Sequence, residues 1–464
     1  MEVRLLLILT SLTLLMSCID KNSGYYRNIG EEQPVIYHLL IDRFYDGDKT
    51  NNYLTDVNNP YGYHGGDLRG LLEKIDYIKG LGINAVLVSP VIDNISSYVD
   101  YKGFKHYGYH GYWPEDFDRI EENFGDMKIF REVVSEFHKN RIAYIQDIVL
   151  NHSGYKSVWI EKTMWVRSVK YGGCIDNDDL KMCLFGLPDF KTEREDVRRF
   201  LISKYANLLR DAGFDGVRID AMKHIDEILI GELREKLKTI NSDVIFVGEY
   251  WGTGSNSYSL EIKSRYNVDM LFDFEFRDYL SAFLRGAMRS EVFVKYLNNR
   301  YDVAEKGFIV FLNNHDLDGL MTHFKDMDEK KRDKIYRIMV LLQFISGGIP
   351  MIYYGEENGL EVGEGISNRR DMVFSERIVG LRGLYRQLIQ LKRSGILNGR
   401  FESEMREGVL VVHLKRKVDE ILSLINLQDS SKEIEIEGNR IRIEDNDFVM
   451  VRSSQGKLDY IIPR

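Results

Sequence analysis

Charged and histidine side chains follow directly on four short apolar runs of this chain, where buried strands would be expected to end. The polar residues at these run ends are Asp147 and His152, Arg218 and Asp220, Glu249, and His315 and Asp316. Any one of them alone would more often be a capping or salt-bridged residue. Together they bring four carboxylates near one another, which is hard to explain structurally because clustering like charges raises the energy of the folded state.

Paired carboxyl groups around one small volume suit the hydrolysis of a glycosidic bond. One ionised carboxylate attacks the anomeric carbon, and a second, protonated carboxyl group gives its proton to the leaving oxygen, with retention of configuration. Arg218 lies two residues before Asp220 on the same face of the expected strand, so it would hold that aspartate ionised. Glu249 precedes Tyr250 and Trp251, whose apolar surroundings would raise its pKa as a general acid needs.

The elements that must position these residues are short apolar runs separated by amphipathic stretches of helical period. The eight runs lie at 35–41, 82–90, 141–150, 214–220, 243–250, 268–274, 307–316 and 348–355. Strands that alternate with helices pair in parallel, and eight such units predict a closed (β/α)₈ TIM barrel. An open doubly wound sheet is the alternative, although no Gly-rich phosphate loop follows the first run. Barrel enzymes build their sites at the C-terminal ends of the strands, where the polar residues stand.

The pattern divides the chain into a barrel and two additions. We expect the catalytic barrel over residues 34–394, with a small excursion domain at 153–191 after the third strand, where periodicity is weak. From 395 to 464 the chain alternates apolar and polar residues at period two, which predicts an antiparallel β-domain.

The first 18 residues have the features of an export signal. A weakly charged start leads into an apolar run too short to span a bilayer, and the run ends in Leu15-Met16-Ser17-Cys18. This ending resembles the lipobox of bacterial lipoproteins, so we expect a lipid on Cys18, a tether at 19–33 and a membrane-anchored protein of the bacterial envelope. The alternative is an ordinary signal peptide with an incidental cysteine.

The composition limits the classes of molecule that this protein is expected to bind. The formal net charge is −9 with scattered lysines and arginines, which argues against a nucleic-acid partner. Cys174 and Cys183 lie in a loop-like segment; in an exported protein we expect a local disulfide between them, and in a reducing compartment they would be unpaired.

Four segments, in this order, resemble the central conserved regions of the α-amylase family of glycoside hydrolases. They are DIVLNH (147–152), GVRIDAMKH (216–224), VGEYW (247–251) and FLNNHD (311–316). The resemblance extends over roughly residues 35 to 390. Its accessory motifs are matched by YHGYW (109–113), LPDF (187–190) and GIPMIYYGEE (348–357).

The resemblance implies a role for each matched residue. Asp220 would be the nucleophile, Glu249 the acid/base, and Asp316 the third carboxylate, which binds hydroxyls of the distorted sugar. Asp147 would buttress Arg218. The implied substrate-binding residues are Arg218, His152 and His315 around the sugar, Tyr112 stacked on it with His110 nearby, and Lys223 and His224 on the leaving-group side.

A loop after the first expected strand offers closely spaced oxygen ligands at Asp46, Asp48, Asn51, Asn52 and Asp67. Such hard, flexible ligands suit Ca²⁺, and the loop resembles the calcium loop of neopullulanase-type members. The alternative is a solvated turn in which Asp67 caps a helix.

A second calcium site, between barrel and excursion domain, is implied by the same resemblance. It would use Asn151, Asp189 and the backbone of His224. Lys181 stands where an acidic ligand is expected, and a lysine could replace the ion electrostatically.

The expected function is retaining hydrolysis of α-1,4-glucosidic bonds in starch-like glucans and maltooligosaccharides. The enzymatic alternatives are cyclomaltodextrinase or neopullulanase activity and 4-α-glucanotransfer. The non-enzymatic alternative is a surface glucan-binding lipoprotein, which would be expected to lack a catalytic carboxylate. We expect a monomer, because only a tether precedes the first strand where neopullulanase-type members carry a dimerising domain.

Overall fold

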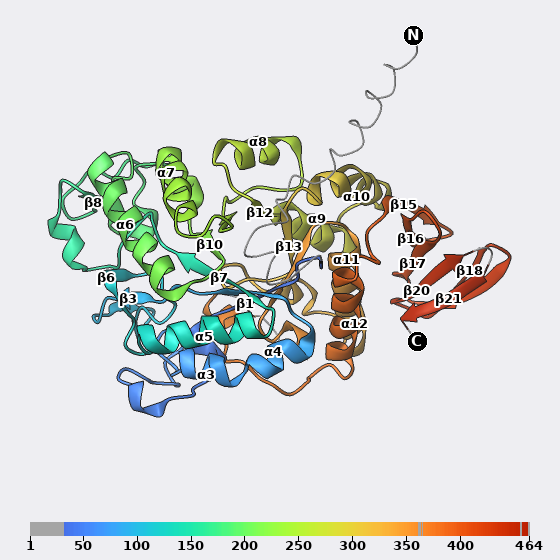
Figure 1. Cartoon of the computed structure of the whole chain (residues 1–464). Helices are drawn as coiled ribbons and strands as arrows, with labels where there is room; N and C mark the ends of the chain where they lie inside the picture. The colour runs from blue at the N-terminus through green and yellow to red at the C-terminus, as the bar shows by residue number, and fades with distance from the viewer. Residues whose placement is uncertain (1–31, 361–362, 364, 455–456, 463–464) are drawn as a thin grey trace, which may run out of the picture.

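Eight parallel strands close into a barrel in the computed structural model, which describes residues 32–360, 363, 365–454 and 457–462 (Figure 1). Around the barrel the order is β1-β14-β13-β12-β11-β10-β7-β2. The strands are β1 (Ile36–Leu39), β2 (Ala85–Val88), β7 (Ala143–Ile148), β10 (Gly216–Ile219), β11 (Ile245–Gly248), β12 (Met270–Phe272), β13 (Phe308–Phe311) and β14 (Ile349–Tyr353). Each lies within one of the eight predicted runs, so the TIM-barrel prediction is confirmed.

Helices surround the barrel strands (Figure 1). They are α2 (Ile41–Phe44), α3 (Leu68–Glu73), α4 (Ile75–Leu81), α5 (Met127–Lys139), α6 (Glu195–Ala212), α7 (Glu227–Lys238), α8 (Ser257–Arg265), α9 (Phe274–Leu284), α10 (Ser290–Ala304), α11 (Glu329–Ile345) and α12 (Leu381–Arg393). In α5 the buried residues Phe130, Val133, Val134 and Phe137 follow the helical period, and the Asp126 side chain caps its first turn. The apolar periodicity therefore packs these helices against the strands.

Two antiparallel strand pairs follow β2, and the sequence patterns did not predict them. They pair β3 (Ile92–Asn94) with β6 (Pro114–Ile120), and β4 (Val99–Tyr101) with β5 (Phe104–His106). These strands are short and carry charged residues, so they lack the apolar alternation by which strands are recognised.

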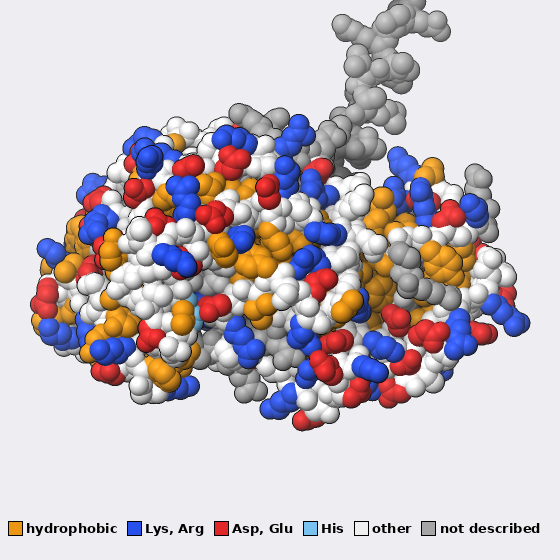
Figure 2. Space-filling view, turned by 90° about the horizontal axis from the view of Figure 1, so that it is seen from below, with side chains coloured by type: hydrophobic (Ala, Val, Ile, Leu, Met, Phe, Trp, Pro, Cys, Tyr) orange, Lys and Arg blue, Asp and Glu red, His pale blue; other side chains and the backbone are white. Residues whose placement is uncertain are grey.

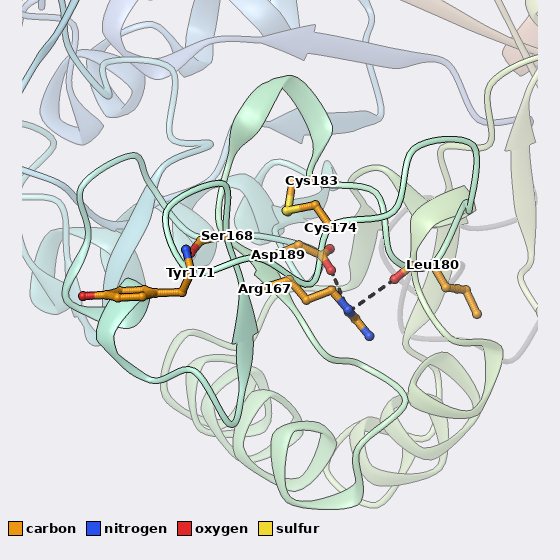
Figure 3. Close-up of a disulfide and its surroundings, with 7 residues drawn as sticks. All are labelled: Arg167, Ser168, Tyr171, Cys174, Leu180, Cys183 and Asp189. Carbon is orange, nitrogen blue, oxygen red and sulfur yellow. Dashed lines mark hydrogen bonds and ion pairs between the residues drawn. A yellow bond between two sulfur atoms is a disulfide. The ribbon is translucent and has the colours of Figure 1, made fainter.

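The excursion domain contains little regular structure. Its elements are η2 (Val158–Glu161), β8 (Val166–Arg167), η3 (Leu184–Gly186) and β9 (Asp189–Phe190). A disulfide joins Cys174 to Cys183 with their Cα atoms 5.4 Å apart (Figure 3).

The C-terminal part is an antiparallel β-domain beside the barrel (Figure 1). Its main sheet has the order β15-β16-β17-β20-β21, and β18 pairs with β19. The strands are β15 (Arg400–Arg406), β16 (Val409–Lys415), β17 (Glu420–Asn426), β18 (Lys432–Ile436), β19 (Asn439–Ile443), β20 (Asp447–Ser454) and β21 (Lys457–Ile462). The predicted antiparallel domain is thus present, and β15 and β21 are the edge strands of its main sheet.

The surface seen in Figure 2 carries acidic and basic side chains interspersed with one another. Among the described residues, no helix has the length and apolar character needed to cross a membrane. Cys18, the expected lipidation site, lies outside the described residues.

Candidate active site

The barrel register brings the predicted catalytic residues to one edge. Arg218 in β10 lies opposite Asp147 of β7 and Val247 of β11. Asp220 directly follows β10, and Glu249 directly follows β11. Because parallel strands end at the same rim, residues distant in sequence converge at the barrel mouth.

The buried guanidinium of Arg218 is the centre of this site. Its Nη1 donates to both carboxylate oxygens of Asp147 (2.9 and 2.8 Å) and to Oδ1 of Asp220 (2.9 Å). Its Nη2 lies 2.6 Å from Oε1 of Glu249. The backbone N–H of Ala221 donates to the other oxygen of Glu249 at 3.0 Å. Three carboxyl groups therefore share one guanidinium, and Asp147 buttresses Arg218 as the resemblance implied.

The pKa values of both catalytic candidates are raised. Burial raises the pKa of Asp220, and the positive charge of Arg218 opposes this rise. Burial likewise raises the pKa of Glu249, again opposed by Arg218. Burial is the cause expected from the sequence, and Tyr250 is buried, but Trp251 is 47% exposed and its hydrogen bond to Glu249 lowers the pKa. Because these carboxyl groups contact one guanidinium, their titrations are coupled, and burial favours holding a proton on one of them.

Tyr112 is fixed in place by groups on several sides. Its ring stacks on His315, with centroids 5.0 Å apart and planes at 6°, and its hydroxyl donates to Asp147 at 2.7 Å. The ring nitrogen Nδ1 of His110 accepts from the Tyr112 N–H, and Nε2 of His152 contacts the Tyr112 carbonyl oxygen (both 3.0 Å). Burial lowers the pKa of all three histidines, so they are neutral near pH 7.

The third carboxylate, Asp316, lies beside two nitrogen groups. Nε2 of His315 is 3.0 Å from one of its oxygens, and Nη2 of Arg369 donates to the other at 3.2 Å. Arg369 also donates to the His315 carbonyl oxygen at 2.9 Å. Sequence analysis missed Arg369, which ends the short 3₁₀ helix η7 (Gly365–Arg369) after β14.

Lys223 and His224 lie on the excursion-domain side of the site. Both belong to the short turn η4 (Met222–His224), which begins after Ala221 in a left-handed conformation (φ 49°). Each contacts Asp179 of the excursion domain: the Lys223 ammonium lies 3.1 Å from its carboxylate, and His224 Nδ1 lies 2.8 Å from its carbonyl oxygen. Asp179 was not singled out from the sequence.

The predicted calcium loop holds three buried oxygens that receive no hydrogen bond from the described residues. They are Oδ1 of Asp46, Asn51 and Asn52. Gly65 completes the cradle with φ +94°, and a Cβ added there would lie 2.8 Å from Asn52 Oδ1. Unsatisfied buried oxygens are costly, and a bound cation would satisfy them, so these residues fit Ca²⁺.

The other two predicted ligands are engaged differently. Asp67 accepts N–H groups of Gly47, Asp48 and Gly70, and so caps α3. Asp48 accepts from the backbone and the hydroxyl of Thr50 (3.0 and 2.6 Å). The helix-capping alternative is therefore realised at Asp67. No group of three or more His, Cys, Asp or Glu that could hold a metal occurs within the described ranges.

The side-chain amide of Asn151 faces oxygen atoms of the other two residues of the implied second calcium site. With its nitrogen turned toward them, the Asn151 amide donates to the His224 carbonyl (2.7 Å) and to Asp189 Oδ1 (3.2 Å). The other Asp189 oxygen accepts from Arg167 at 2.7 Å (Figure 3). Lys181 pairs instead with Asp178 at 3.6 Å. The expectation for Lys181 was wrong, because Arg167 supplies the positive charge beside Asp189.

The fold and site together define a (β/α)₈-barrel protein with a carboxylate-based site at the C-terminal rim. Comparison with known proteins identifies the family to which it belongs. Residues 38–172 and 175–379 match the family model described as "Alpha amylase, catalytic domain". The chain therefore belongs to the α-amylase family.

Its relatives within that family differ in their activities. A cyclomaltodextrin glucanotransferase of Klebsiella oxytoca is 30% identical over 70% of this chain, and neopullulanase 2 of Thermoactinomyces vulgaris is 26% identical over 78%. The chain spans 58% and 63% of the length of these two relatives. Among solved structures, an Anoxybacillus α-amylase superimposes with a TM-score of 0.75 at 27% identity, covering 93% of this chain and 97% of that one.

Proposed function

We propose that this protein is a retaining glycosidase that cleaves α-1,4-glucosidic bonds of starch-like glucans and maltooligosaccharides. The observation that carries the proposal is the pair Asp220 and Glu249, which contact the two ends of one guanidinium, that of Arg218. A double displacement requires a carboxylate nucleophile and a carboxylic acid proton donor close together around one glycosidic bond.

The proposed reaction assigns one task to each group. The Asp220 carboxylate attacks the anomeric carbon while Glu249 gives its proton to the leaving oxygen. Glu249, now ionised, then takes a proton from the water that cleaves the glycosyl–Asp220 ester. Asp316, held by His315 and Arg369, binds sugar hydroxyls as the ring distorts. Tyr112 supports the sugar ring.

Transfer to a sugar hydroxyl is the second candidate function. Water and a sugar hydroxyl compete for the same covalent intermediate, and one of the relatives is a cyclomaltodextrin glucanotransferase. A neopullulanase-type specificity is favoured by the similarity to neopullulanase 2 and by the buried oxygens of the calcium loop.

The product profile tests these alternatives. Purified protein is incubated with soluble starch, maltoheptaose and cyclodextrins, products are separated by chromatography, and the anomer released first is identified by NMR. The α-anomer supports the retaining mechanism, whereas the β-anomer contradicts it. Release of no reducing sugar and no transfer product from any of the three would favour the glucan-binding protein.

We propose that Ca²⁺ binds at Asp46, Asn51 and Asn52, where it would neutralise charge and order the loop after α2. A ligand that binds only the folded state stabilises it by about 2.7 kcal/mol at a concentration a hundredfold above its Kd. We therefore expect CaCl₂ to raise the melting temperature by a few degrees relative to EDTA, with about one ion bound per chain. Calorimetry with each additive is the measurement.

The matched variants are Asp46→Ala and Asn58→Ala. The first removes a buried oxygen that has no donor, and the second alters an exposed residue nearby. Asp46→Ala should lose the response to calcium and Asn58→Ala should keep it. An equal response in both variants would contradict the assigned ligands.

We also propose that the protein is exported, acylated at Cys18 and anchored as a monomer in the bacterial envelope. The sequence Leu15-Met16-Ser17-Cys18 after an apolar run supports this proposal. Labelling with radioactive palmitate in the native host tests it: the wild type should carry label and sediment with membranes, and Cys18→Ser should do neither. An unlabelled wild type would contradict the anchor.

A further inference from the structure

The disulfide closes a loop, residues 174–183, that the rest of the excursion domain holds at a second point. Within the loop the N–H of Ile175 donates to the carbonyl of Lys181 at 2.9 Å. The buried guanidinium of Arg167 donates to the Leu180 carbonyl (3.4 Å) and to Asp189 (2.7 Å), as Figure 3 shows. The loop is thus tied to β8 and β9 as well as to itself.

Asp179, next to Leu180, connects this loop to the barrel. Its carbonyl oxygen faces Nδ1 of His224 at 2.8 Å, and its carboxylate lies 3.1 Å from the Lys223 ammonium. A carbonyl only accepts, so Nδ1 of His224 carries the proton and its Nε2 is left as an acceptor in the neutral ring. One residue therefore fixes both the tautomer of His224 and the position of Lys223.

We propose that Asp179 is a positioning residue that presents Lys223 and His224 to the leaving-group part of the glucan, and that the disulfide-closed loop holds it there. The inference rests on the proposed function, since it concerns the sugar that departs from the glycosidic bond. Asp179 itself is exposed and acts through its two neighbours. The loop would thereby set how well the enzyme binds substrates that extend past the cleaved bond.

Activity on two substrates distinguishes this positioning role from effects on protein stability or on the catalytic carboxylates. Maltoheptaose places sugars on the leaving-group side, whereas α-maltosyl fluoride has fluoride as its leaving group and places none there. Loss of positioning should therefore affect only the first substrate. Effects on protein stability or on the catalytic carboxylates would affect both.

The variants are Asp179→Asn, its matched control Asp176→Asn in the same loop, and the double variant Cys174→Ser/Cys183→Ser. Asp179→Asn keeps the backbone carbonyl but loses the partner of Lys223; Asp176 is equally exposed. We expect Asp179→Asn to raise KM for maltoheptaose about fivefold, and the cysteine double variant about tenfold, with kcat changed less than about threefold. For α-maltosyl fluoride, kcat/KM should stay within about twofold of the wild type.

Each contrary result has a definite meaning. If Asp179→Asn behaves like Asp176→Asn on maltoheptaose, or lowers activity on both substrates equally, the positioning role is overturned. If a melting curve shows that the cysteine variant does not fold, the result for Asp179→Asn alone decides whether Asp179 has the positioning role. A wild type that is inactive on both substrates overturns the proposed function itself, which is distinguishable from an active wild type whose variants are unchanged.

Discussion

Replacement of Asp220 by asparagine should lower kcat on maltoheptaose by at least about 10⁴-fold, as losses of covalent nucleophiles do in other enzymes. The amide has the same shape and keeps an oxygen that can accept from Arg218, but it cannot form the glycosyl ester. Arg218 retains its bonds to Asp147 and Glu249, so no buried charge is left without a partner. Burying the ionised form of Asp220 costs free energy, and the Arg218 guanidinium offsets this cost only in part, so removal of the charge should not destabilise the fold.

We therefore expect the variant to unfold at the same temperature as the wild type or higher. Initial rates and a thermal melt measure the two parts of this prediction. Asp278→Asn, on the exposed face of α9, is the matched control and should leave the rate unchanged; the Asp278 side chain is 76% exposed. Activity of Asp220→Asn above one hundredth of the wild-type rate would be incompatible with its role as nucleophile.

The barrel could be predicted because each of its strands is a short apolar run. A parallel strand is covered by helices on its outer face and by other strands' side chains within, so nearly every position is apolar. Strand β10 shows how the apolar runs locate the site. Its four residues, Gly216–Ile219, are all buried, and Asp220 follows directly after them. The strand pairs after β2 and the edge strand β15 gave no such signal: β15 has the sequence RFESEMR, with one fully buried position among seven.

The convergence of the candidate catalytic carboxylates was predictable for the same reason, because strand ends converge in any closed barrel. The positions of Arg369 and Asp179 were not predictable, since Arg369 ends a short 3₁₀ helix and Asp179 lies in a turn, and tertiary contacts decide the direction of both segments. Asp179 reaches His224 across 45 residues of sequence, and Arg369 reaches Asp316 across 53. No periodic pattern encodes such contacts. The calcium loop could be predicted in part. The residue types suggested its ligands, but only the structure distinguishes Asp46, Asn51 and Asn52 from Asp67, which caps a helix.

Replacement of Glu249 by glutamine should have an effect that depends on the leaving group. A glucan needs a proton on its departing oxygen, and general acid catalysis contributes about 10²–10⁴-fold, so we expect a loss of that order with maltoheptaose. Fluoride needs no such proton, and α-maltosyl fluoride should form the intermediate on Asp220 at a rate near that of the wild type. Hydrolysis of the intermediate requires Glu249 as the base, so rapid mixing should show a burst of fluoride followed by slow turnover.

The same variant tests the pKa argument. Because burial raises the pKa of Glu249, its acid form persists above the ordinary range of a carboxyl group. Wild-type kcat/KM on maltoheptaose should fall as the pH rises through that value, because the proton donor is lost. The burst rate of Glu249→Gln on α-maltosyl fluoride should not fall in this pH range, since glutamine does not titrate. Glu261→Gln, on the exposed surface of α8, is the control and should keep the wild-type profile.

Azide distinguishes the acid/base from the nucleophile. It attacks the intermediate without a base, so it should accelerate turnover of α-maltosyl fluoride by Glu249→Gln and yield α-maltosyl azide with retained configuration. In Asp220→Asn no ester forms, so azide can only displace fluoride directly and give the β-product. If azide gave the β-product with Glu249→Gln and the α-product with Asp220→Asn, the two assignments around Arg218 would have to be exchanged.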